Sequence, residues 1–156
     1  MLGRLHQKTA AATIRADLHL TPDLSVQYYG SPFVSNGRFD GFKRAADTLA
    51  STYDDRVYRY APHEIVLAPD ARSYEIDEPA GRYSFAVPDF SFREFRSNLV
   101  ARWEFTPGSS LYLVWSQGRT STVDGWDPSL GRSLDALWGT PAHNIVLAKF
   151  SDWIGL

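Results

Sequence analysis

The stretch ATIRADLHLTPDLSVQYYG, residues 12–30, alternates between apolar and polar side chains and decides the fold class. The apolar parity of its first half holds Ala12, Ile14, Ala16, Leu18 and Leu20. The turn residues Thr21, Pro22 and Asp23 interrupt the pattern, which then resumes with alternate apolar residues from Leu24 onward. A period of two indicates β-strands, and a Pro-Asp break predicts a tight hairpin turn between them.

A second hairpin is predicted around residues 94–118. Its apolar parity holds Phe95, Leu99, Ala101, Trp103 and Phe105, followed by Leu111, Leu113 and Trp115. Thr106 to Ser109 form the turn, because proline presets φ and glycine accepts positive φ. A fifth strand is predicted near 144–154. The expected strands therefore lie near 11–20, 24–34, 94–105, 110–118 and 144–154.

The connections between these strands alternate between short and long. Two tight turns separate the hairpin strands, and long loops are expected near 35–91 and 119–143. Transmembrane β-barrels have this arrangement, and strands of about 9–11 residues span a bilayer. Inside the loops, Phe39, Phe42, Ala46 and Leu49 recur at helical spacing, so we expect a short helix near 40–50. We also expect a helical turn near 133–138 and a small hairpin near 56–79. The predicted fold is all-β: one region, 1–156, forming an antiparallel up-and-down meander, the C-terminal portion of a transmembrane-type β-barrel with long external loops.

The apolar parity faces either lipid or the core of a soluble sheet, because both environments favour one apolar face. Lipid excludes charged residues from that face more strictly than a soluble core does, since Arg or Lys there costs about 2–4 kcal/mol at the midplane of the bilayer. No charge occurs on the apolar parity of the first four strands. The predicted lipid-facing residues are Ile14, Leu18, Leu24, Val26, Leu99, Trp103, Phe105, Leu111, Leu113 and Trp115. The predicted lumen-facing residues are Arg15, Asp17, Arg96, Arg102 and Glu104.

The overall composition narrows the function classes. Hydrophobic residues make up 44% of the 156 residues and charged residues 22%, which excludes wholesale disorder. The net charge of −2 gives no basic surface, so nucleic acid is not an expected partner. There is no cysteine, and therefore no disulfide or thiolate metal site. The N-terminal residues lack the apolar run of a signal peptide, which fits a cytosolic protein or a piece of a longer exported one.

No catalytic motif is present, and we expect neither enzymatic activity nor a cofactor. His6, His19, His63 and His143 are scattered through the chain, without the spacing of metal ligands. Two acidic groups, Asp124 with Asp127 and Glu75 with Asp77 and Glu78, are read as turn and surface residues, because a Ca²⁺ loop needs more oxygen ligands at closer spacing.

Aromatic residues in the predicted loops suggest a second interpretation. Trp126, Trp138, Tyr58 and Tyr60, together with Tyr83, are candidate glycan contacts, since exposed rings stack on sugars. The alternative is that these rings anchor the long loops. A soluble β-sheet carbohydrate-binding module using these aromatics is the competing function.

Three segments resemble a known family: TPDLSVQYYGSPFVSNGRFDGFK (21–43), FREFRSNLVARWEFTPGSSLYLVWSQGRT (92–120) and NIVLAKFSDWI (144–154). They are similar to the last strands of a domain of unknown function in Gram-negative bacteria, notably Bacteroidota, that follows a module similar to family-9 carbohydrate-binding domains. The resemblance implies an outer-membrane β-barrel segment in a surface protein that handles carbohydrate. Its implied partners are membrane lipid, the remaining barrel strands and a saccharide. Single-chain barrels have at least eight strands, so five imply a fragment.

Overall fold

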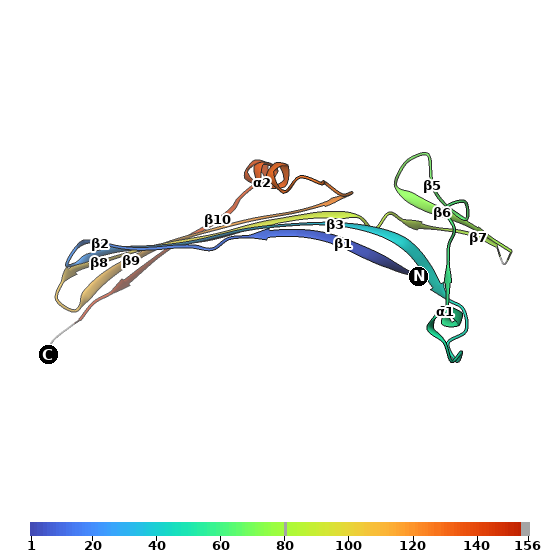
Figure 1. Cartoon of the computed structure of the whole chain (residues 1–156). Helices are drawn as coiled ribbons and strands as arrows, with labels where there is room; N and C mark the ends of the chain where they lie inside the picture. Colours follow the sequence, from blue (N-terminus) through green and yellow to red (C-terminus); the bar gives the residue numbers. More distant parts are fainter. Residues whose placement is uncertain (80, 154–156) are drawn as a thin grey trace. The chain divides into compact units, whose positions relative to one another are not determined.

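The computed structural model describes residues 1–79 and 81–153 and shows an all-β protein with short helices (Figure 1). The elements, in chain order, are β1 (Leu2–Ala11), β2 (Ile14–Thr21), β3 (Leu24–Ala45), α1 (Tyr53–Arg56), β4 (Val57–Arg59), β5 (Ile65–Leu67), β6 (Ser73–Glu78), β7 (Gly81–Ala86), β8 (Phe90–Thr106), β9 (Ser109–Asp124), α2 (Leu130–Gly139) and β10 (His143–Ser151). The all-β prediction is confirmed.

The long strands form one sheet with the order β1-β3-β8-β9-β10. β2 also pairs with β3, and the amide of Ala12, between β1 and β2, donates to the carbonyl of Pro32 at 3.1 Å. β1 and β2 therefore make one interrupted strand beside β3. The hairpin turns predicted at Pro22-Asp23 and Pro107-Gly108 connect β2 to β3 and β8 to β9, and Gly108 adopts a φ of +85° that favours glycine. A second sheet has the order β5-β6-β7.

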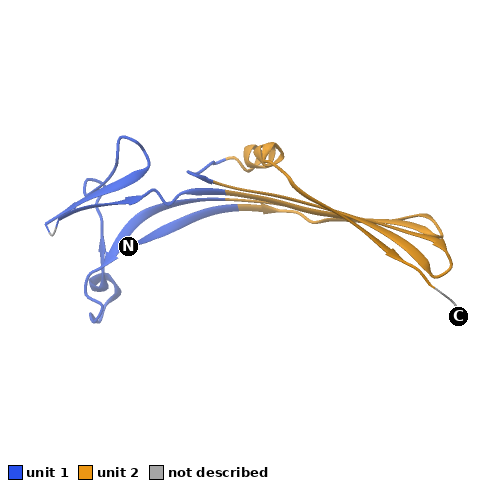
Figure 2. Ribbon diagram, turned by 180° about the vertical axis from the view of Figure 1, so that it is seen from behind, with its two compact units in different colours: residues 1–8, 36–91, 123–128 blue, residues 9–35, 92–122, 129–156 orange. Residues whose placement is uncertain are grey.

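The chain divides into two compact units (Figure 2). The first unit contains Met1–Lys8, Asn36–Ser91 and Val123–Pro128. The second contains Thr9–Ser35, Phe92–Thr122 and the described residues from Ser129 onward. The two hairpins, β10 and α2 all belong mainly to the second unit, which is therefore the one that bears on the predicted membrane surface.

The two predicted long loops contain regular structure. β3 continues to Ala45, α1 and β4–β7 lie within 35–91, and β9 continues to Asp124. The small hairpin predicted near 56–79 is formed in part: β5 pairs with β6, with Pro69 to Ala71 at the tip, whereas β4 at the start of its first arm pairs with β3. The predicted helical turn at 133–138 lies inside the longer helix α2. The predicted fifth strand corresponds to β10, and Ile154 lies outside the described residues.

The helix predicted over 40–50 is wrong, because residues 40–45 belong to β3. Gly41 adopts a φ of +57° and breaks the alternation of this strand. As a result Phe39 and Phe42 both lie beside Gly3, whose Cβ position is 3.4 Å and 3.1 Å from their rings. The three-residue spacing of Phe39 and Phe42, which is typical of a helix, therefore comes from a strand with one irregular residue.

The buried apolar core of the described residues is small. Its members are Val34, Phe42, Ala68, Ile76, Phe95 and Leu137. In the first unit, the rings of Phe42, Tyr74 and Phe85 cluster with centroids 5.1–5.4 Å apart. In the second unit, Phe95 contacts Trp138 of α2 at a centroid distance of 4.8 Å. Most apolar side chains of the long strands in the second unit therefore remain outside any core.

Candidate functional site

The candidate site is the pair of faces of the long sheet in the second unit. Strand register assigns each residue to a face, because directly paired residues share one. β2 pairs Ile14 with Gly30 and Leu18 with Val26, while β10 pairs Val146 with Trp115. Ring and hydrogen-bond contacts connect the remaining strands. They join Phe33 to Phe92, Arg102 to Tyr112 and Asn98 to Ser116.

These pairings bring all ten predicted lipid-facing residues to one face, which we call the apolar face. It comprises Ile14, Leu18, Leu24, Val26, Leu99, Trp103, Phe105, Leu111, Leu113 and Trp115, together with Val146 and Phe150 of β10. Near the short turns its aromatic rings touch, since Phe105 stacks on Phe150 at 5.5 Å and contacts Trp103 at 5.9 Å. Many of these side chains are exposed, Val146 at 75% and Trp103 at 51% among them. An exposed apolar surface of this extent is typical of an interaction surface.

The length of the apolar face matches a bilayer. On β8 the apolar face runs from Phe95 to Phe105, with Ser97 as its polar exception, and Arg93 is the next residue of that parity. Ten residue steps measure about 33 Å along a strand. A barrel strand is tilted by about 35–45°, which reduces this to about 25 Å, the height of the apolar band of known membrane barrels.

The opposite face, which we call the polar face, holds all five predicted lumen-facing residues: Arg15, Asp17, Arg96, Arg102 and Glu104. The guanidinium of Arg102 donates to Glu104 at 2.6 Å and to the hydroxyl of Tyr112 at 3.2 Å. Lys149 lies 5.9 Å from the centroid of that Tyr112 ring. Arg102 and Glu104 therefore pair along β8, and Tyr112 of β9 lies between Arg102 and Lys149 of β10.

Two of the candidate glycan contacts, Tyr58 and Tyr60, are engaged by protein groups. The hydroxyl of Tyr58 donates to Glu64, and that of Tyr60 donates to Glu78 at 2.5 Å. Arg44 of β3 also donates to Glu78, at 3.0 Å. Burial and the hydrogen bond to Glu78 raise the pKa of Tyr60 well above its usual range. Hydrogen bonding by Tyr60 lowers the pKa of Glu78, so the carboxylate stays charged. This cluster connects β3 to β6, and its side chains form hydrogen bonds with one another.

The two candidate tryptophans belong to different units. In the first unit, the ring of Trp126 has the cations of Arg38 at 5.0 Å and Lys8 at 5.9 Å from its centroid. In the second unit, Trp138 contacts Phe95 yet remains 51% exposed. Trp126 therefore serves as a packing partner for two cations, whereas Trp138 presents a ring to the surroundings.

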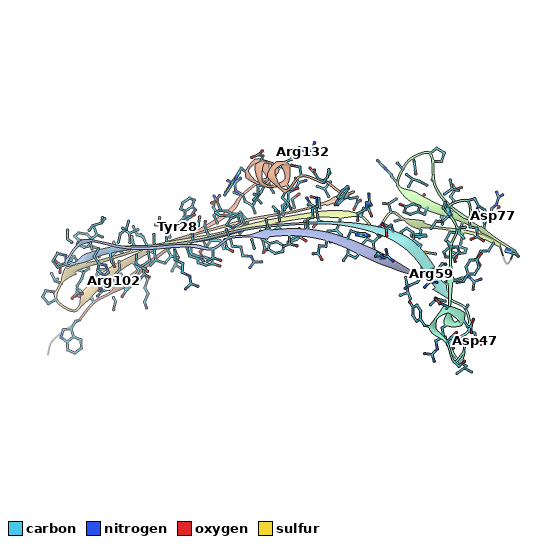
Figure 3. The ribbon with its side chains drawn as sticks, in the orientation of Figure 1. Tyr28, Asp47, Arg59, Asp77, Arg102 and Arg132 are labelled. Atoms are coloured by element: carbon cyan, nitrogen blue, oxygen red, sulfur yellow. The ribbon has the colours of Figure 1, made fainter. Side chains whose placement is uncertain are left out.

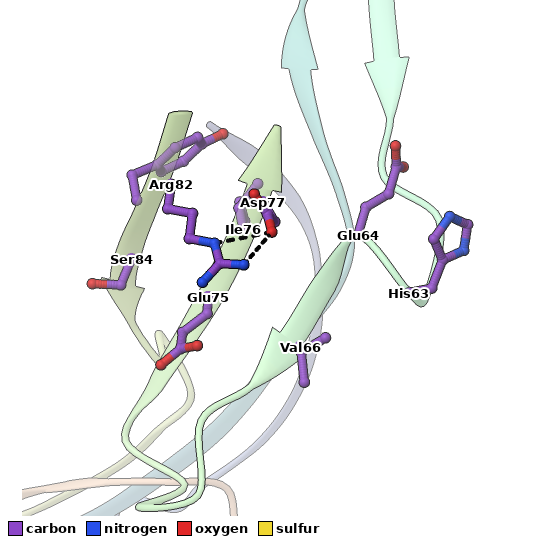
Figure 4. Close-up of a pocket in the computed structure, with 9 residues that line it drawn as sticks. His63, Glu64, Val66, Glu75, Ile76, Asp77, Arg82 and Ser84 are labelled. Carbon is purple, nitrogen blue, oxygen red and sulfur yellow. Dashed lines mark hydrogen bonds and ion pairs between the residues drawn. The ribbon is translucent and has the colours of Figure 1, made fainter. Parts of the chain in front are cut away.

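An open pocket of ≈ 590 Å³ lies along β5–β7 in the first unit (Figure 4). Its lining includes Glu64, Glu75, Asp77, Arg82 and Tyr83. The guanidinium of Arg82 donates to Asp77 at 2.9 Å, and this pair lowers the pKa of Asp77. The acidic group at 75–78 is thus divided, because Asp77 pairs with Arg82 while Glu78 pairs with Arg44.

Sequence reasoning did not find the cluster around Glu78. Arg44 and Glu78 are 34 residues apart, and no local pattern links them. Among residues 1–79 and 81–153, no group of three or more His, Asp or Glu side chains is placed to hold a metal ion. No helix in the described part of the chain is long and apolar enough to cross a membrane. Comparison of the chain with protein-family models, curated proteins and solved structures gives no match.

Proposed function

We propose that this chain is a non-enzymatic segment of an outer-membrane β-barrel, part of a larger surface protein that binds or takes up carbohydrate. The observation that carries the proposal is the division of the long sheet into the apolar face and the polar face. The apolar face has the length of a bilayer's apolar layer, and the polar face carries the paired charges suited to an aqueous lumen. The Gram-negative location and the saccharide rest on the family resemblance.

The partners in this proposal are lipid and further β-strands. In the described residues β10 pairs only with β9, and β1 only with β3, so each outer strand has one edge without a strand. Unpaired backbone groups in hydrocarbon cost several kcal/mol each, so a membrane sheet must close. We infer that strands from elsewhere in a longer chain, or from another chain, pair with β10 and with β1 and β2.

The test is the behaviour of residues 1–156 expressed without detergent. The proposal predicts aggregates that dissolve in detergent or vesicles and recover β-structure there, measured by sedimentation and circular dichroism. A soluble monomer with a cooperative urea transition in plain buffer would contradict the proposal. That result would instead favour the soluble carbohydrate-binding module.

A further inference from the structure

Helix α2 lies on the apolar face, at the end far from the short turns. Its Trp138 contacts the ring of Phe95, and Arg119 of β9 donates to the carbonyls of Trp138 and Thr140 at 2.6 Å and 2.8 Å. Phe95 and Arg119 both have the parity of the apolar face. Figure 3 shows α2 on the same side of the sheet as Tyr28, which pairs with Ala16 on the parity of the apolar face. The helix therefore lies where the apolar face meets its polar continuation.

The two sides of α2 differ in character. Ser133 and Leu137 are buried against the sheet, while Arg132, Asp135 and Trp138 are exposed. The hydroxyl of Ser129 accepts from the amide of Arg132 at 3.3 Å and caps the helix. The helix is thus held by its buried side and by the hydrogen bonds from Arg119, and its outer surface combines charges with one large ring.

Three cations lie on α2 or near the end of the apolar face that α2 contacts. Arg93 and Arg119 continue the parity of the apolar face beyond Phe95 and Gln117, and Arg132 lies on α2 itself. Asp135 is the acidic residue of the helix. The Nε atoms of Arg93 and Arg119 are buried and have no hydrogen-bond partner among the described residues. Positive groups with one exposed tryptophan at the boundary of an apolar band match the headgroup layer, where tryptophan concentrates and lipid phosphates attract Arg.

We propose that α2 is an interfacial helix whose occupant is the headgroup layer of the bilayer, with Trp138 among the headgroups and the exposed side chain of Arg132 toward lipid phosphates. This inference rests on the proposed function, because the apolar face must lie against lipid for α2 to reach the headgroups. The interfacial helix also fixes the depths of two residues in the bilayer. Leu113 lies in the hydrocarbon, whereas Ala136, exposed on α2, lies at the boundary.

The test uses single-cysteine variants of the full chain, which has no cysteine of its own. Leu113→Cys and Ala136→Cys are labelled with an environment-sensitive fluorophore and bound to phosphatidylcholine vesicles that carry bromine at known acyl depths. We expect deep bromines to quench the Leu113 probe most, and shallow bromines to quench the Ala136 probe most. A quenched Leu113 probe with an Ala136 probe that is unquenched, or quenched at equal depth, would overturn the interfacial helix alone. Two unquenched probes would overturn the proposed function as well.

A second measurement tests the phosphate contact. Vesicles with added phosphatidylglycerol should bind Arg132→Gln about fivefold more weakly than the parent chain, since each Arg near an anionic surface contributes about 1 kcal/mol. Arg96→Gln, on the polar face, is the matched control and should bind like the parent. Equal affinities for Arg132→Gln, Arg96→Gln and the parent would contradict the proposed lipid contact.

Discussion

Two neighbouring residues of β10 allow the lipid-facing assignment to be tested with one substitution on each face. Val146 is 75% exposed and pairs with Trp115 on the apolar face. Leu147 is 54% exposed and pairs with Val114 on the polar face. Both are aliphatic, both are on the same strand, and both present their side chains outside any core. Replacing each with Arg therefore changes only the face that carries the charge.

The expected cost follows from the depth of each position. Trp115 precedes Ser116, which bonds to Asn98, so Val146 lies near the middle of the span from Phe95 to Phe105. Arg at the midplane of a lipid face costs about 2–4 kcal/mol, or about 30- to 900-fold in the folding equilibrium. Leu147→Arg places its cation two residues from Lys149 on the polar face, where we expect at most about 0.5 kcal/mol.

The assay is unfolding by guanidinium from vesicles or detergent micelles, followed by tryptophan fluorescence, with both variants and the parent compared under one condition. A soluble sheet would tolerate Arg at both exposed positions within about 0.5 kcal/mol. Equal free energies of unfolding for Val146→Arg and Leu147→Arg, or a larger loss for Leu147→Arg, would refute the assignment of the apolar face to lipid.

Three further predictions concern a glycine packed against Phe90, the cap of α2 and the pH dependence of stability. Gly37→Val should destabilise the chain by about 1–3 kcal/mol in urea titrations, because a Cβ at Gly37 would overlap the ring of Phe90. Adding Phe90→Ala to this variant should recover part of the lost stability. If the two substitutions instead destabilise additively, the overlap is not the cause. Ser129→Ala should cost about 1 kcal/mol through the lost cap of α2, while Ser129→Asp should not; equal unfolding midpoints would show that the cap is not formed. Because its pKa is raised, Tyr60 contributes fully to the free energy of unfolding below about pH 10, and this contribution is lost as the pH rises further. Because its pKa is lowered, Glu78 contributes fully above about pH 4.3, and this contribution is lost as the pH falls below that value. Tyr60→Phe should remove the alkaline loss in a urea–pH series, and an unchanged alkaline limb would assign it to another group.

The two hairpins were predictable because their information is local. Alternation over residues 12–30 and 94–118 places side chains on faces with a period of two, and turn residues interrupt it where the structure turns. The same parity grouped the ten apolar and five polar residues that the structure brings to two faces. Their environment, lipid or otherwise, stays a prediction, because parity alone cannot identify it.

Other features needed information that the local sequence does not carry. β3 continues beyond Ser35 through Asn36 and Gly37, where polar and small residues hide the alternation. Gly41 then shifts the parity and produced a false helical spacing. The contacts of Glu78 with Arg44 and Tyr60 join residues 34 and 18 positions apart, so no window of sequence contains them. Because Tyr60 donates a hydrogen bond to Glu78, it is not the freely exposed loop ring that the sequence suggested.

The most direct test of the central claim is the water accessibility of each residue along β10 in vesicles. Single cysteines at positions 144–151 would be reacted with a water-soluble maleimide, and the rates compared. A lipid-facing apolar face predicts a period of two, with slow reaction at Val146, Ala148 and Phe150 and fast reaction at Leu147 and Lys149. Uniformly fast reaction, or protection without alternation, would contradict the assignment of the apolar face to lipid.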